Sequence, residues 1–140
     1  MSSEHQAIGS VMQMVQHLCM RYGWQHEVKS TKSEATVIVR TMYGSMQKVN
    51  IFGRKDINGQ PVMVFYTGVI QADAVQDPMS LLRENSQLFH CHFAIVKRMI
   101  VVLDTQLLMT ADYPEVAKKI ENVALQGENF QKRFHGGWSQ

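Results

Sequence analysis

The first half of the chain shows one helical pattern followed by several strand patterns. Apolar residues recur at helical spacing across residues 6–22, which predicts an amphipathic helix that ends near Gly23. Beyond it, apolar and polar residues alternate with a period of two, as they do in half-buried strands. The predicted strands cover residues 24–28, 35–43, 46–52 and 62–70. Asn58-Gly59, between the last two, is a strong signal for a β-hairpin.

The middle of the chain begins with a short helical pattern over residues 77–88. Asp77-Pro78 is a typical helix start, because the carboxylate can accept a bond from an orphan backbone N–H and proline at the first position loses no bond. The apolar stripe of this helix consists of Met79, Leu82 and Leu88, with Leu81 beside it. The stripe is mostly one-sided, as in an amphipathic helix.

A period of two returns at residue 89 and predicts a pair of strands. One face of the first strand carries Phe89, Cys91, Phe93 and Ile95, and the other carries His90, His92, Ala94 and Val96. Lys97-Arg98 is the only polar break before the next apolar run, so it predicts a tight turn, although it lacks the Asn-Gly or Asp-Gly signature. The second strand, over residues 99–110, is apolar on both faces through its middle and should lie centrally in a sheet.

The chain closes with a helix that starts at a capping box, with Asp112 as the cap and Glu115 three residues later. Gly127 lies on its apolar stripe, where it either weakens the helix or permits a close approach. The order is thus α-β(3-4)-α-β2-α with hairpin-length turns. This order predicts a two-layer α+β fold, in which an antiparallel sheet has helices packed on one face.

Length and composition narrow the class of protein. With 140 residues, 45% of them hydrophobic and 19% charged, the chain is expected to form a single domain over 1–140, with flexible termini at 1–5 and 134–140. The net charge of +2 implies no strong field for nucleic acid. No apolar run is long enough to span a membrane, and the first residues lack a signal-peptide pattern. Cys19 and Cys91 each fall on an apolar face, as buried thiols in a reducing cytoplasm do, so we expect a cytoplasmic protein.

Several residues in the second half resemble those of a known family. Leu81, Leu82 and Asn85 precede the pair Phe93-Ala94, and the apolar run Val101 to Leu103 follows. This arrangement resembles the YbjN-like family, which shares the type III secretion chaperone-like fold. The resemblance implies a small homodimer that binds extended segments of a partner protein, with no established catalytic residues. The chain departs from that pattern in two ways. Its pI is near 8.6, whereas such chaperones are typically acidic, and it has an extra predicted strand before the middle helix.

The compact cluster of ligand-type residues is His90-Cys91-His92. On a strand the two histidines share a face, as a two-His metal site could use, and His26 is the nearest guess for a third ligand. Surface histidines are the favoured interpretation, since no acidic residue stands at a spacing that completes the site. Cys91 points away from both histidines, which argues against a nucleophile activated by a neighbouring base.

Other polar residues have structural explanations beside functional ones. Asp104 and Asp112 could serve acid–base chemistry, but a strand end and a helix cap account for them. Asn85 falls on the helix stripe, so it either caps neighbouring backbone or contacts a ligand. A basic group near the hairpin, with aromatic residues nearby, offers a platform for nucleic acid that the low net charge does not favour. That group is Lys48, Arg54 and Lys55, with Tyr43, Phe52 and Tyr66.

The sequence favours a non-enzymatic protein-binding module, chaperone-like or adaptor-like, that needs no cofactor and forms a homodimer. Its protein partner is unidentified, and Asn85 and Met79 are the candidate contacts; the ten methionines suit an adaptable surface. The alternative is a small metal-binding protein or enzyme that uses the His90-Cys91-His92 strand. A weak nucleic-acid binder is the third hypothesis. For the core, we expect Phe93 and Val101 to be buried, with Leu82 and Ile120 packed nearby.

Overall fold

The computed structural model describes residues 3–29, 34–88 and 90–134. Its helices are α1 (Ser3–Tyr22), α2 (Pro78–Asn85) and α3 (Tyr113–Arg133), with short 3-10 helices η1 (Ala72–Ala74) and η2 (Leu108–Thr110). Its strands are β1 (Gln25–Lys29), β2 (Glu34–Arg40), β3 (Met46–Lys55), β4 (Pro61–Gln71), β5 (His92–Val96) and β6 (Met99–Leu107). The predicted order of elements is confirmed. Phe89, and residues 1–2 and 135–140 of the termini expected to be flexible, lie outside the described residues.

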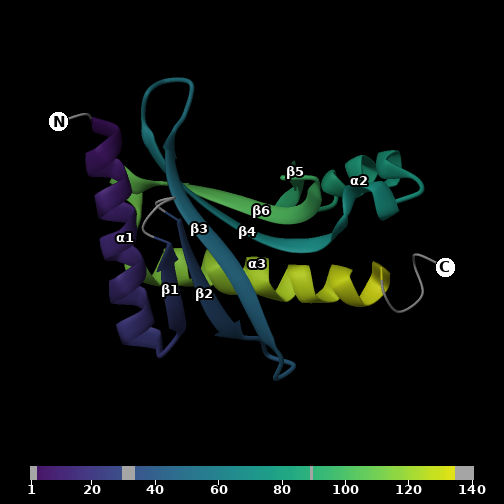
Figure 1. Cartoon of the computed structure of the whole chain (residues 1–140), viewed down its shortest axis with the longest axis horizontal. Helices are drawn as coiled ribbons and strands as arrows, with labels where there is room; N and C mark the ends of the chain where they lie inside the picture. The colour runs from purple at the N-terminus through teal and green to yellow at the C-terminus, as the bar shows by residue number, and fades with distance from the viewer. Residues whose placement is uncertain (1–2, 30–33, 89, 135–140) are drawn as a thin grey trace.

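The strands form one antiparallel sheet in the order β1-β2-β3-β4-β6-β5 (Figure 1). β6 lies between β4 and β5, as its two apolar faces predict. The β3–β4 hairpin turns at Gly59, whose φ of +77° is one that glycine adopts without strain. The helices pack on the sheet, so the predicted α+β class with helices on an antiparallel sheet is confirmed.

One face of the sheet, which we call the covered face, packs against α1 and α3 (Figure 1). The sheet supplies residues of β2, β3 and β4 that alternate along each strand, as the period of two predicts. These buried sheet residues are Ala35, Val37, Val39, Val49, Ile51, Met63 and Phe65. The helices supply Val11, Val15, Leu18, Cys19, Val116, Ala117, Ile120, Val123 and Ala124. Burial of this apolar area is the main source of the stability of the fold.

A second apolar cluster lies where the end of α3 meets β5, β6 and α2. Phe93 is only 6% exposed, and its ring meets that of Phe130 edge-on with centroids 4.5 Å apart. Leu81 of α2 and Phe134 join the same cluster. The predicted burial of Phe93 is therefore confirmed. Ile120, which the sequence predicts to pack near Phe93, lies in the first cluster instead.

Helix α3 approaches the sheet closely at Gly127. A Cβ atom at this position would lie 2.2 Å from the Cγ2 atom of Thr67 on β4, well inside van der Waals contact. The Thr67 hydroxyl meanwhile donates to the carbonyl oxygen of Lys48 and accepts from the amide of Gln47. Of the two roles predicted for Gly127, the structure thus shows the close approach.

Helix α2 differs from the prediction in length and rotation. It ends at Asn85, and Leu81 is the residue it buries, while Leu82 is 59% exposed, so the predicted packing of Leu82 is wrong. The reason is Asn85, whose side chain bonds to Phe93 and turns the helix so that Leu81, one turn earlier, faces the core. The side chain of Asp77 makes no cap bond and instead pairs with Arg83 at 3.3 Å, so its predicted capping role is also wrong.

Candidate functional site

The face of the sheet opposite α1 and α3, which we call the open face, packs against neither of these helices, and α2 contacts the sheet at the edge strand β5. The strand register places Phe52 beside Val64, Tyr66 beside Leu103, and Ala94 beside Val101 on this face. Its apolar part consists of Phe52, Val62, Val64, Tyr66, Ala94, Val96, Val101 and Leu103. Val64, Tyr66 and Val101 are buried and the other five are partly exposed, so this face offers a partly exposed apolar surface of the kind that can bind a partner.

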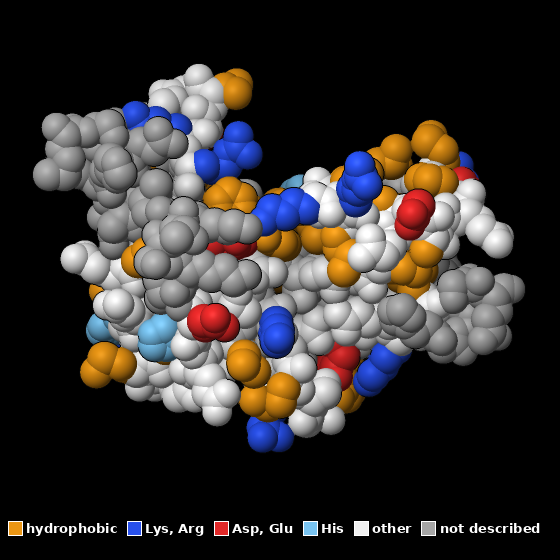
Figure 2. Space-filling view, viewed as in Figure 1, with side chains coloured by type: hydrophobic (Ala, Val, Ile, Leu, Met, Phe, Trp, Pro, Cys, Tyr) orange, Lys and Arg blue, Asp and Glu red, His pale blue; other side chains and the backbone are white. Residues whose placement is uncertain are grey.

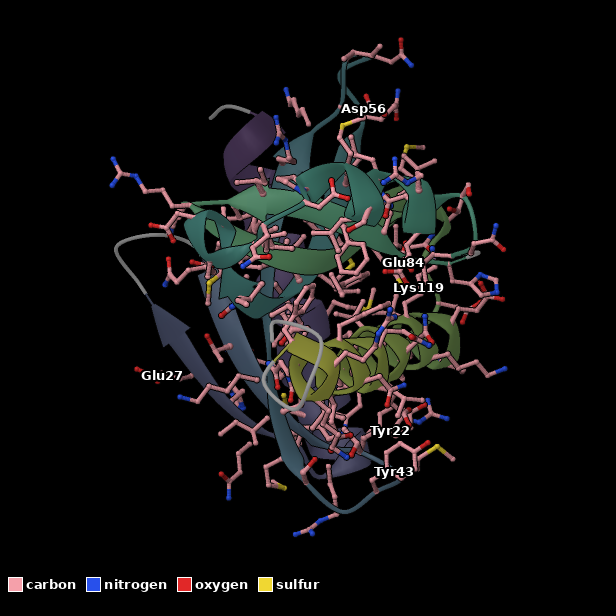
Figure 3. All side chains as sticks on the ribbon, turned by 90° about the vertical axis from the view of Figure 1, so that its right-hand side faces the viewer. Tyr22, Glu27, Tyr43, Asp56, Glu84 and Lys119 are labelled. Carbon is pink, nitrogen blue, oxygen red and sulfur yellow. The ribbon has the colours of Figure 1, made fainter. Side chains whose placement is uncertain are left out.

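The open face is hollowed into two adjoining grooves. The larger one, of about 920 Å³, lies between the tip of the β3–β4 hairpin and β5, and its floor includes Val64 and Leu103. The smaller one, of about 520 Å³, runs past Tyr66 and Met99, and Val96 lines both. Figure 2 shows a hollow between the hairpin and the α2 end, with Lys and Arg side chains beside hydrophobic ones. Asp56 marks the hairpin tip, on the far side of the sheet from α3 (Figure 3).

The half of the open face formed by β2 and β3 is polar. The Tyr66 hydroxyl donates to the Glu34 carboxylate at 2.6 Å, and both side chains are buried. Burial and this bond to Glu34 raise the pKa of Tyr66 well above its usual value. Beside them Thr36 donates to the side-chain oxygen of Asn50 at 2.8 Å. These polar groups bond to each other, so the apolar surface lies on β4, β6 and β5 and extends onto β3 only at Phe52.

Val101 shows how the expected core and the open face differ. It is 1% exposed, so the prediction of burial is confirmed. Its register neighbours are Ala94 and Gly68, however, and it lines the smaller groove rather than the cluster around Phe93. The expectation that Val101 packs in the sheet–helix core is therefore wrong. The reason is phase, since Phe93 is paired with Val102 and not with Val101.

Asn85, a candidate partner contact, is engaged with the edge of the sheet. Its side-chain oxygen accepts from the backbone N–H of Phe93 at 2.6 Å, and its amide donates to the carbonyl oxygen of Phe93 at 3.4 Å. Asn85 thereby takes the place of a neighbouring strand at that point of β5, which is an edge strand. The interpretation that Asn85 caps neighbouring backbone agrees with this geometry. Met79, the other candidate contact, is 57% exposed on the surface of α2.

The structure does not gather the histidines into a site. His90 and His92 are exposed, while His26 is on β1 at the opposite edge of the sheet from β5, with four strands between them. No group of three His, Cys, Asp or Glu residues in the described ranges could hold a metal ion. His92 is the first residue of the edge strand β5 and His90 precedes that strand, so the two histidines do not share a strand as the period of two predicts.

Cys91 lies in a setting that suppresses its reactivity. It is 5% exposed, and burial together with the nearby Asp104 raises the pKa of its thiol to about 11. Asn122 of α3 donates to its sulfur at 3.9 Å. A thiol with this pKa is almost wholly protonated at neutral pH, so Cys91 is a poor nucleophile. Cys19 is also a buried free thiol, with a pKa that burial raises to about 11.

The two candidate acid–base residues are held in structural roles. Asp112 caps α3, since its carboxylate accepts from the backbone N–H of Glu115 at 2.8 Å. Asp104 lies within β6 and not at its end, so the predicted explanation by a strand end is wrong. It is buried on the covered side, where one carboxylate oxygen accepts from the backbone N–H of Thr105 and the other has no hydrogen-bond partner among the described residues. They lie on separate elements, and neither faces the grooves of the open face.

The basic and aromatic residues of the hairpin region are only partly brought together. Lys48, Phe52, Arg54 and Tyr66 line the grooves of the open face. Tyr43 instead lies in the β2–β3 turn. The ammonium nitrogen of Lys132 lies over its ring, 5.0 Å from the ring centroid. Lys97, in the β5–β6 turn, joins the lining although it is far away in the sequence, and only the sheet order reveals this.

Comparison with solved structures identifies the fold. The chain superposes on ExsC, in its complex with ExsE, with a TM-score of 0.57 and 10% identity, covering 94% of this chain and 96% of that one. It also superposes on the Yersinia pestis type III secretion chaperone SycH, in complex with a fragment of YscM2. That match has a TM-score of 0.51 and 11% identity, and covers 84% of this chain and 97% of SycH. The fold is that of a type III secretion chaperone.

Sequence comparison does not extend this result. No family model matches the chain, and a search of curated proteins finds no match. Within the described residues, no helix is both long and apolar enough to cross a membrane.

Proposed function

We propose that the protein is a non-enzymatic, chaperone-like binding module that holds a segment of a partner protein on its open face. The observation that carries this proposal is the apolar part of the open face, which forms the floor of two grooves on the side of the sheet away from α1 and α3. Both structural neighbours are complexes with another polypeptide, which supports a protein as the ligand. The shared fold is also compatible with the proposed relationship to the YbjN-like family.

Site-specific photocrosslinking tests this function. A photoreactive residue at Leu103, in the floor of the larger groove, should form an adduct with a recurrent protein in cells, identified by mass spectrometry. The matched control carries the same residue at Glu121, which is exposed on α3. Equal adducts from both positions, or none from Leu103, would contradict the proposal.

We also propose a homodimer, formed through α2 rather than the open face. Met79 and Leu82 are exposed on neighbouring turns of α2, 57% and 59% respectively, and form an apolar pair that a second copy can cover. Light scattering should give twice the 16.0 kDa mass of one chain, and Leu82→Ser should lower it to a monomer. A monomeric unsubstituted chain would refute the dimer while leaving the open face as the binding surface.

The two buried free thiols suit a reducing compartment, so we propose that the protein acts in the cytoplasm. Cell fractionation with a tagged chain tests this localisation.

A further inference from the structure

The charge around the two grooves is far from the balance of the whole chain. The chain has 14 Lys and Arg against 12 Asp and Glu, whereas the groove linings hold five basic residues and one acidic residue. The basic residues are Lys48, Arg54, Lys55, Lys97 and Lys119. The acidic one, Asp56, accepts backbone N–H bonds from Asn58 and Gln60 within the hairpin turn. The carboxylate is thus bonded to its own turn, and the surroundings of the grooves are predominantly positive.

These charges stand at the two ends of the apolar strip. Arg54 belongs to the larger groove at the hairpin end, whereas Lys48 and Lys97 belong to the smaller groove at the other end. Between them lie aliphatic side chains such as Val64 and Leu103. Lys119 reaches the larger groove from α3 by donating to the carbonyl oxygen of Thr105 at 2.8 Å, which fixes its charge at the rim.

Building on the proposed function, we propose that the open face selects a partner segment whose apolar stretch is flanked by acidic residues. The apolar strip would bury the centre of such a segment, and the basic rims would pair with its ends. At Phe93, backbone pairing of a partner with β5 is blocked, because Asn85 already occupies the N–H and carbonyl groups of that residue. Recognition on the face depends on the apolar strip and on the charge of the rims.

Charge and shape argue against two other occupants of the open face. A second copy would bring its own basic rims against these ones, since a two-fold contact places like surfaces together, and the repulsion would oppose it. Nucleic acid gains affinity by stacking bases on exposed aromatic rings. Here Tyr66 is buried and meets the ring of Phe52 edge-on at 6.0 Å, while the remaining floor is aliphatic.

Fluorescence anisotropy with three labelled peptides tests the inference on the full chain. All three share a core of alternating valine and serine, and they carry two glutamates, two serines or two lysines at each end. At low salt the glutamate peptide should bind about tenfold more tightly than the lysine peptide, and added salt should reduce the difference. The double variant Lys48→Glu/Arg54→Glu leaves three basic and three acidic residues in the groove linings, so it should abolish the preference for the glutamate peptide. The control Arg21→Glu/Lys118→Glu makes the same change in net charge away from the grooves and should leave the order unchanged.

Each outcome has a separate meaning. Equal affinity for the three peptides would overturn the charge selection and leave the proposed protein-binding function intact. Absence of binding by all three would overturn both. Tighter binding of a single-stranded oligonucleotide than of the glutamate peptide, or loss of a dimer on Leu103→Asp with a gain in peptide affinity, would show a different occupant and overturn the inference.

Discussion

The covered face and the open face use alternate residues of the same strands and meet different surroundings. On β4, Met63 and Phe65 are fully buried against the helices, while Val64 and Tyr66, on the open face, are 4% and 8% exposed without any described helix above them. Burial alone therefore does not separate the two faces. The two faces differ in what lies over the side chains. Packed helices lie over the covered face, and grooves lie over the open face.

This difference has a consequence for substitutions. A truncated side chain on the covered face leaves a cavity, whereas one on the open face leaves a depression that water can fill. Stability should thus depend mainly on the covered face and partner binding on the open face. Truncations on the two faces can separate these roles.

The largest effect is expected for Phe93→Ala on the covered face. Phe93 packs edge-on against Phe130, so its removal should lower the free energy of unfolding by about 3–5 kcal/mol in chemical denaturation. Leu103→Ala on the open face should cost only about 1 kcal/mol, because the residue borders a groove. Equal losses for the two variants would mean that the open face is also covered in solution.

The close approach of α3 to the covered face gives the next effect. Gly127→Ala places a methyl group against the Cγ2 atom of Thr67, and should cost about 1–3 kcal/mol despite the better helix propensity of alanine. Thr67→Ser removes that atom and keeps the hydroxyl. A denaturation cycle over the two single variants and the double variant should show most of the loss recovered in the double variant. Additive losses would place the strain elsewhere.

Asn85 joins α2 to the edge strand β5 through its bonds to Phe93. Its substitution should have a smaller effect on the free energy of unfolding. Asn85→Ala leaves the N–H and carbonyl groups of Phe93 without their present partner, and should cost about 1–2 kcal/mol. It should also speed hydrogen exchange at the Phe93 amide. Asn85→Asp keeps the acceptor for the Phe93 N–H but loses the donor to the Phe93 carbonyl oxygen. The protection of the Phe93 amide in this variant should therefore lie between that in the unsubstituted chain and that in Asn85→Ala. Unchanged exchange in both variants would contradict this role.

The order of elements could be predicted from the sequence because it depends on local periodicity. The helix of residues 6–22, the strand of residues 62–70 and the cap at Asp112 are all local patterns, and each is found close to its predicted position. The role of Asn85 followed from the same reasoning, since a polar residue on an apolar stripe needs partners.

The rest depended on contacts between distant segments. Periodicity gave a stripe through Leu82, but the bond between Asn85 and Phe93 rotates α2 and buries Leu81 instead. The basic rims were missed for a similar reason. Only the sheet order places Lys97 on the same face as Lys48 and Arg54, and a single sequence does not reveal which strands lie side by side.

The two hairpins that border the open face differ in turn chemistry, and this difference gives the smallest predicted effect. Gly59 in the β3–β4 turn has φ of +77°, whereas Lys97 and Arg98 in the β5–β6 turn take φ of 51° and 65° with full side chains. Such angles strain a residue that has a Cβ atom. Arg98→Gly should therefore raise the free energy of unfolding by about 0.5–1 kcal/mol, and Gly59→Ala should lower it by a similar amount, in chemical denaturation. Because Arg98 does not line either groove, the peptide affinities of Arg98→Gly should stay within experimental error of those of the unsubstituted chain. A destabilised Arg98→Gly protein would instead mean that the side chain of Arg98 contributes more to the turn than its backbone strain costs.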